Sequence, residues 1–70
     1  MARTKKEPIV AYVIPMRLNF REGIDGRVID TIPEGAAVEV ISKKKGWCNI
    51  RFCGVTGWVV AEYLKEADND

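Results

Sequence analysis

The feature that most constrains this chain is a series of short segments in which apolar and polar residues alternate. Residues 47–52 show it most clearly, because Cys48, Ile50 and Phe52 fall on one face while Trp47 and the polar residues fall on the other. A period of two is typical of a half-buried β-strand. No segment has the period of an amphipathic helix. The pattern therefore predicts an all-β fold, a small antiparallel sheet closed into a barrel or a sandwich.

Glycine and proline residues divide the chain into the expected elements. Strands are expected at residues 9–14, 18–21, 27–32, 37–41, 47–52 and 57–60. Residues 42–46 are expected to form a polar hairpin loop. Cys53-Gly54 stands where a two-residue hairpin turn favours Asn-Gly, which requires a positive φ at Cys53. Residues 61–64 are too short for an α-helix and predict one 3₁₀ turn that closes an end of the barrel.

A chain of 70 residues has room for one domain. Residues 1–8 are polar, charged and without a period, so a flexible N-terminal tail is expected there. Residues 65–70 are acidic, and a second flexible tail is expected from residue 65 onward. The folded domain is therefore expected to span residues 9–64.

Composition excludes several classes of function. The chain has no histidine, which removes the commonest general base and the commonest metal ligand. Eleven Lys+Arg stand against ten Asp+Glu, and domains that bind nucleic acid by bulk electrostatics are usually far more basic. The lysine run at residues 43–45 is interpreted as a solvated loop. We expect no catalysis, no cofactor, no metal and no specific nucleic-acid partner, which leaves a binding or structural module.

The two cysteines are expected to remain free thiols. Cys48 and Cys53 are five residues apart, so their Cα atoms would be ~16 Å apart along a strand, beyond the ~7 Å limit for a disulfide. No signal peptide or apolar membrane span is visible. The chain as written is therefore expected in the cytoplasm, without membrane insertion. It would be extracellular or at the cell wall if it is a fragment of a larger protein or is released by phage lysis.

Three stretches, in this order, resemble the bacterial SH3-like domain family. They are LNFREG at residues 18–23, VIDTIPEG at 28–35, and the closing elements GW at 46–47, GVTGWV at 54–59 and YL at 63–64. The resemblance covers nearly all of residues 9–64 and implies an SH3-like barrel of five to seven short antiparallel strands. The chain departs from the family pattern in two features. The loop after Gly23 is short, and Cys53 stands where the family usually has asparagine.

The resemblance also implies a binding function, because similar domains often direct cell-wall hydrolases to peptidoglycan peptides. Trp47 lies opposite the core face of its strand, and an exposed tryptophan beside polar groups makes a good contact platform. The six ligand-binding candidates are the aromatic residues Trp47, Tyr63 and Trp58 and the polar residues Asn19, Arg21 and Arg51. The predicted ligand is a peptide or a peptide-containing molecule.

Other interpretations stay open at this stage. Trp58 is also suited to act as a structural lid, and Asn19 to bond loop backbone. Arg21 is equally suited to pair with Glu22 or Asp25 and hold its loop. The module as a whole could instead be an intracellular or phage-encoded protein–protein adaptor, or a self-associating structural subunit. A monomer is favoured, although the oligomeric state is left open.

Overall fold

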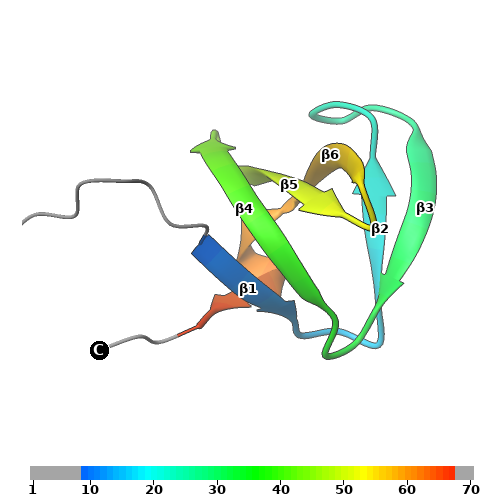
Figure 1. Cartoon of the computed structure of the whole chain (residues 1–70). Coiled ribbons are helices and arrows are strands. Elements are labelled where there is room, and N and C mark those ends of the chain that lie inside the picture. Colours follow the sequence, from blue (N-terminus) through cyan, green and yellow to red (C-terminus); the bar gives the residue numbers. More distant parts are fainter. Residues whose placement is uncertain (1–8, 68–70) are drawn as a thin grey trace, which may run out of the picture.

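Seven strands and one 3₁₀ turn follow one another in the computed structural model, which describes residues 9–67 (Figure 1). The elements are β1 (Ile9–Val13), β2 (Arg17–Arg21), β3 (Val28–Pro33), β4 (Ala37–Lys44), β5 (Trp47–Phe52), β6 (Val55–Val60), η1 (Ala61–Tyr63) and β7 (Leu64–Glu66). The fold class is confirmed: an all-β, small SH3-like barrel with a terminal 3₁₀ turn. No helix in the described part of the chain is long and apolar enough to cross a membrane.

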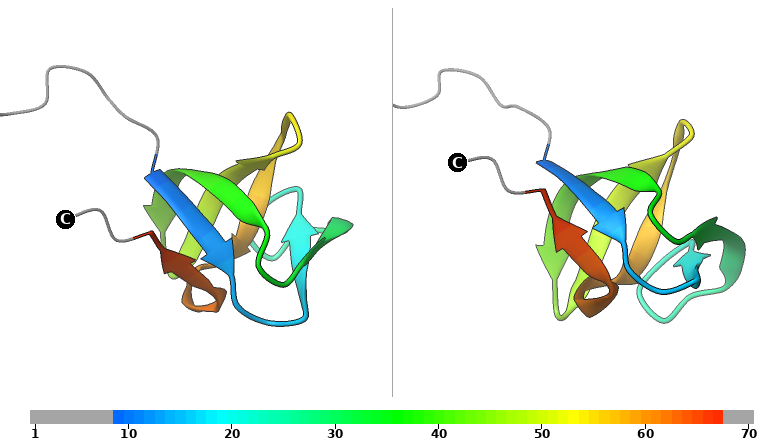
Figure 2. Two further views of the ribbon diagram at one scale, coloured as in Figure 1. Left: turned by 60° about the horizontal axis from the view of Figure 1, so that its bottom comes forward. Right: turned by 90° about the horizontal axis from the view of Figure 1, so that it is seen from below.

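All strand pairs are antiparallel, and they form one strongly curved sheet in the order β3-β2-β6-β5-β4-β1-β7. Strands β4, β5 and β6 form its centre through two consecutive hairpins. The β2–β3 hairpin lies at one end, and β1 with β7 lies at the other (Figures 1 and 2). The curvature brings the β1–β2 loop, the β2–β3 loop and the 3₁₀ turn η1 near the start of β5.

The core is built from the inward positions of the alternating segments. The buried hydrophobic residues are Ala11, Val13, Leu18, Phe20, Ile32, Val38, Val40, Cys48, Ile50 and Val59. Because successive side chains on a strand point to opposite faces, alternate residues of β2, β4 and β5 share this one core. Phe52 and Leu64 are half-buried and pack against it. Both cysteines are free, Cys48 buried and Cys53 exposed.

The two central hairpins close through two-residue turns with positive φ at both positions. Cys53 and Gly54 have φ of 53° and 81°, and Phe52 pairs with Val55 across the turn. These values are those of a type I′ turn, so the turn predicted at Cys53-Gly54 is confirmed. As a consequence β6 begins at Val55, two residues before the expected start.

The prediction of a loop over residues 42–46 is wrong. Strand β4 continues to Lys44, which pairs with Trp47, and only Lys45 and Gly46 form the turn, with φ of 52° and 81°. A register shift between Val40 and Ser42 carries β4 past Ile41. The lysine run is therefore mostly strand. Its charged side chains point to solvent, and polarity alone did not distinguish an exposed strand from a loop.

The folded part extends beyond the expected boundary at residue 64. Lys65 and Glu66 belong to β7, which pairs with β1, and the backbone N–H of Ala67 donates to the carbonyl of Val10 at 2.8 Å. The start of the acidic segment is therefore part of strand β7, because it pairs with the edge of β1 that β4 does not occupy. The expected tails at residues 1–8 and 68–70 lie outside the described residues.

Candidate ligand-binding groove

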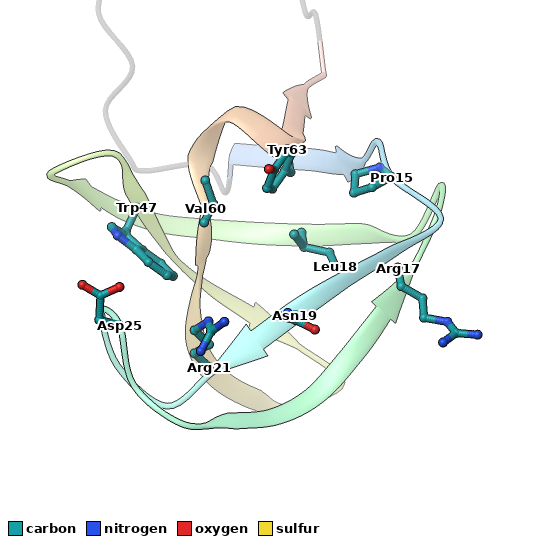
Figure 3. A pocket seen from close by; sticks show the side chains of 9 residues that line it. All are labelled: Pro15, Arg17, Leu18, Asn19, Arg21, Asp25, Trp47, Val60 and Tyr63. Atoms are coloured by element: carbon teal, nitrogen blue, oxygen red, sulfur yellow. The ribbon is translucent and has the colours of Figure 1, made fainter.

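A groove of about 490 Å³ lies where the β1–β2 loop, β2, the β2–β3 loop, the start of β5, the end of β6 and η1 meet (Figure 3). Its lining combines two aromatic rings with two arginines and one carboxylate. The lining residues are Pro15, Arg17, Leu18, Asn19, Arg21, Asp25, Trp47, Val60 and Tyr63. Because they come from six segments of the chain, the groove is a product of the tertiary fold.

Trp47 reaches the groove because it is the first residue of β5 and points away from the core. It pairs with Val60 at the end of β6, and paired residues in an antiparallel ladder share a face. The backbone N–H of Ala61 donates to the carbonyl of Gly46 at 2.9 Å, which ties η1 to the turn before Trp47. Trp47 is half-buried, so its indole is held in place while part of it stays accessible.

Tyr63 faces the same groove from the 3₁₀ turn. Its backbone carbonyl accepts a hydrogen bond of 3.0 Å from the N–H of Ile14, which fixes η1 against the chain just before Pro15. The Tyr63 side chain remains 42% exposed. Trp47 and Tyr63 thus enter the groove from separate elements (Figure 3). Two aromatic side chains held by backbone hydrogen bonds offer a large apolar contact at a low cost in conformational entropy.

Arg21 is the last residue of β2, and Asp25 lies in the tight loop that joins β2 to β3. The loop is closed by Glu22 N–H to the carbonyl of Arg27 at 2.9 Å and by Gly26 N–H to the carbonyl of Gly23 at 2.8 Å. The Nη1 atom of Arg21 donates to the carbonyl of Gly26 at 2.8 Å.

This geometry corrects the expected pairing of Arg21 with a neighbouring acid. The partner of Arg21 is the backbone carbonyl of Gly26. Glu22 instead lies 3.8 Å from Arg27, in an exposed ion pair. The reason is the tight loop, in which Asp25 takes a left-handed φ of 58° and the Gly26 carbonyl comes within reach of the guanidinium.

Four of the six predicted site residues line the groove: Asn19, Arg21, Trp47 and Tyr63. Trp58 and Arg51 do not. Trp58 is half-buried on the outer face of β6, where it pairs with Arg21 and with Asn49 of β5. Arg51 is exposed on the outer face of β5, between Glu39 and Thr56. Both point outward as their strand parity requires. Trp58 is the cross-strand neighbour of the groove residue Arg21 but does not line the groove itself, and Arg51 lies four residues along β5 from Trp47.

Five lining residues were not predicted: Pro15, Arg17, Leu18, Asp25 and Val60. Val60 follows from pairing, since a two-residue turn at Cys53-Gly54 places it opposite Trp47. Asp25 had a weaker signal, because it stands between two glycines in the loop beside Arg21. Nothing local marks Pro15 or Arg17, because their place depends on how the β1–β2 loop crosses the barrel end.

A second, smaller cavity of about 310 Å³ lies elsewhere on the barrel, lined by Val40, Lys43, Cys48, Ala61, Leu64 and Glu66. The ammonium of Lys43 and the carboxylate of Glu66 form an ion pair at its rim, and their hydrogen bond raises the pKa of Lys43. Burial raises the pKa of the Cys48 thiol. Among residues 9–67, no three acidic, cysteine or histidine side chains are grouped as a metal site would require.

The structure is thus a small SH3-like barrel with a groove lined in part by aromatic side chains. The sequence matches the bacterial SH3 domain family over residues 17–65, which is most of the chain. The protein therefore belongs to the bacterial SH3 domain family, as its sequence motifs indicate.

The chain is also similar in sequence to segments of larger proteins. The chain is 37% identical over 49 residues to the "Putative N-acetylmuramoyl-L-alanine amidase YrvJ" of Bacillus subtilis (strain 168), a match covering 70% of this chain and 10% of that protein. It is 50% identical over 38 residues to the SH3 and PX domain-containing protein 2A of Mus musculus and of Homo sapiens, covering 53% of this chain and 3% of each. The chain thus spans a small part of each of these relatives.

Proposed function

We propose that this domain is a non-catalytic binding module whose groove takes a peptide of the bacterial cell wall. The observation that carries the proposal is the groove itself, in which Trp47 and Tyr63 stand beside Asn19 and Arg21. Aromatic rings with a few polar groups are the usual lining of a ligand site, and 490 Å³ is within the range of about 300–1,000 Å³ found for such sites.

The groove suits a peptide segment better than a large flat partner. Its residues come from loops and strand ends around a rigid barrel, which is where small β-domains hold extended peptides. The groove lining also includes the apolar residues Leu18, Val60 and Pro15. A peptide offers the same mixture, with amide groups for Asn19 and Arg21 and side chains for the aromatic rings.

Membership of the bacterial SH3 family and the likeness to an amidase of Bacillus subtilis favour a cell-wall ligand. The name of that relative describes the larger protein, of which this chain matches one tenth. Residues 17–65 of this chain form its bacterial SH3 domain, and the role of that domain is proposed to be ligand capture.

A non-catalytic role agrees with the chemistry of the groove. Among the described residues that line the groove, Asp25 is the one carboxylate, so these residues offer no pair of acidic groups for general acid–base catalysis. Binding is the function that these groups can perform.

The test is sedimentation of the 70-residue protein with purified peptidoglycan sacculi, followed by measurement of the protein left in the supernatant. Saturable depletion, and release by soluble stem peptides cut from the same sacculi, are expected. The Arg51→Gln variant is a matched control that should sediment like the unmodified protein. Protein that stays in the supernatant over the full range of sacculus concentrations would reject the cell-wall ligand.

A further inference from the structure

One groove residue, Arg21, is held by a single side-chain hydrogen bond and has further N–H donors without a partner among residues 9–67. Arg21 is half-buried, and its Nη1 atom donates to the carbonyl of Gly26 at 2.8 Å. Within residues 9–67 this is the one side-chain hydrogen bond of Arg21, so its Nε and Nη2 donors remain available for a ligand. The bond to a tightly closed loop restrains the guanidinium before any ligand arrives.

The charges around the groove favour an anion. Arg17 and Arg21 line it against the single carboxylate of Asp25. Within residues 9–67, Arg27 and Lys43 each have a carboxylate partner within 4.0 Å, whereas Arg17 and Arg21 have none. An arginine that lines an aromatic groove without an acidic partner among these residues can pair with an incoming anionic group.

Figure 3 distinguishes the two arginines. The Arg17 side chain extends away from the other lining residues, whereas Arg21 lies between Asp25 and Asn19, on the side where Trp47 stands. A guanidinium presents parallel N–H donors that match the two oxygens of a carboxylate, and such charge-assisted bonds are stronger than neutral ones. Arg21 is therefore the better placed of the two to receive an acid group.

From these observations we infer that the groove selects peptides carrying a free carboxylate, which Arg21 binds while Trp47 and Tyr63 contact the adjoining residues. The inference rests on the proposed function, since it specifies the ligand of the same groove. The opposite choice, a ligand ammonium at Asp25, is disfavoured because Asp25 is exposed at the loop tip and its charge is screened by water.

The experiment compares three preparations of sacculi from which phosphate-containing polymers have been removed. In one preparation the carboxyl groups are converted to amides with a carbodiimide and ammonia. In the second the amino groups are acetylated, and the third is untreated. The inference expects binding to fall about tenfold or more on the amidated sacculi and to be unchanged on the acetylated ones.

Variants link this loss to Arg21. Arg21→Gln should bind untreated sacculi about tenfold more weakly and should no longer distinguish amidated from untreated sacculi. Arg21→Lys keeps the charge but not the paired donors, so an intermediate affinity is expected. Arg51→Gln removes an exposed charge outside the groove and should retain the full preference. Thermal unfolding by circular dichroism confirms that each variant is folded before binding is measured.

The outcomes separate this inference from the proposed function. Equal binding to untreated and amidated sacculi would overturn carboxylate selection and leave the cell-wall function standing. Loss of binding on acetylated sacculi alone would show that an ammonium is recognised and would also overturn it. If no preparation binds the protein, the proposed function fails with it. If Arg21→Gln keeps the preference for untreated sacculi, Arg21 is not the recognising group.

Discussion

Gly57 and Phe20 are packed so closely that a Cβ atom added at Gly57 would lie 2.6 Å from Cε1 of Phe20. The same atom would lie 2.7 Å from the backbone carbonyl oxygen of Arg21. Gly57 precedes Trp58, whose pairing with Arg21 joins β6 to β2. The missing side chain therefore allows the β2–β3 hairpin to close onto the central strands.

We predict that Gly57→Ala lowers the free energy of unfolding by about 2 kcal/mol, since overpacking a core typically costs 1–3 kcal/mol. Urea denaturation followed by tryptophan fluorescence measures it. Gly23→Ala is the matched control, because a Cβ at Gly23 meets nothing within 4 Å. Equal stability of the two variants would show that the close packing does not constrain the fold.

Cys53 occupies the first position of a type I′ turn with φ of 53°. Left-handed backbone is unfavourable for most L-residues by roughly 1–2 kcal/mol, and asparagine tolerates it better. We therefore expect Cys53→Asn to raise the free energy of unfolding by up to about 1 kcal/mol. Lys45→Asn, at the equivalent position of the preceding hairpin with φ of 52°, should do the same. Cys53→Ala separates the turn effect from loss of the thiol, and it should give no gain in a urea melt.

Trp47 lines the groove, whereas Trp58 lies outside it on β6. Trp47→Ala should weaken binding to sacculi by about tenfold or more, as expected for an aromatic residue at the centre of a binding site. Trp58→Ala should change affinity by less than about threefold, although it can lower stability by exposing the sheet. Binding isotherms of both variants with sacculi measure these two changes in affinity. A larger loss with Trp58→Ala would move the site to the flank of the barrel.

Cys48 is buried, and desolvation raises the pKa of its thiol above the ordinary value of 9.0. At pH values above 9.0 the thiol is ionised in the unfolded chain but still protonated in the folded one. The unfolded state then binds fewer protons, so stability falls as the pH rises from 9.0 toward the folded pKa.

Urea melts between pH 8 and 10.5 test this dependence, with Cys48→Val as the variant that removes the thiol. The variant should lose less stability than the unmodified protein over this interval. Lys43, whose pKa is raised by the hydrogen bond to Glu66, contributes in the same direction only above its ordinary value of 10.5. Identical slopes for the two proteins below that pH would mean that Cys48 is not the titrating group.

Much of the fold follows from local pattern. The alternation at Leu18 and Phe20 and at Cys48 and Ile50 placed these residues in the core, and Cys53-Gly54 indicated a tight hairpin. The pattern gave a wrong prediction where a polar segment forms a strand. Lys44 looked like loop but is strand, because a hairpin with a two-residue turn leaves both flanking residues paired.

The sequence by itself determined the strands, the core face and the outward direction of Trp47, because side-chain direction along a strand alternates with every residue. Only the tertiary structure decided which outward residues meet. Trp47 and Tyr63 share a groove because the Gly46 carbonyl holds η1 beside the start of β5, whereas Trp58 and Arg51 also point outward but do not line it. The partner of Arg21 was decided there too, since a backbone carbonyl becomes available only when its loop has folded.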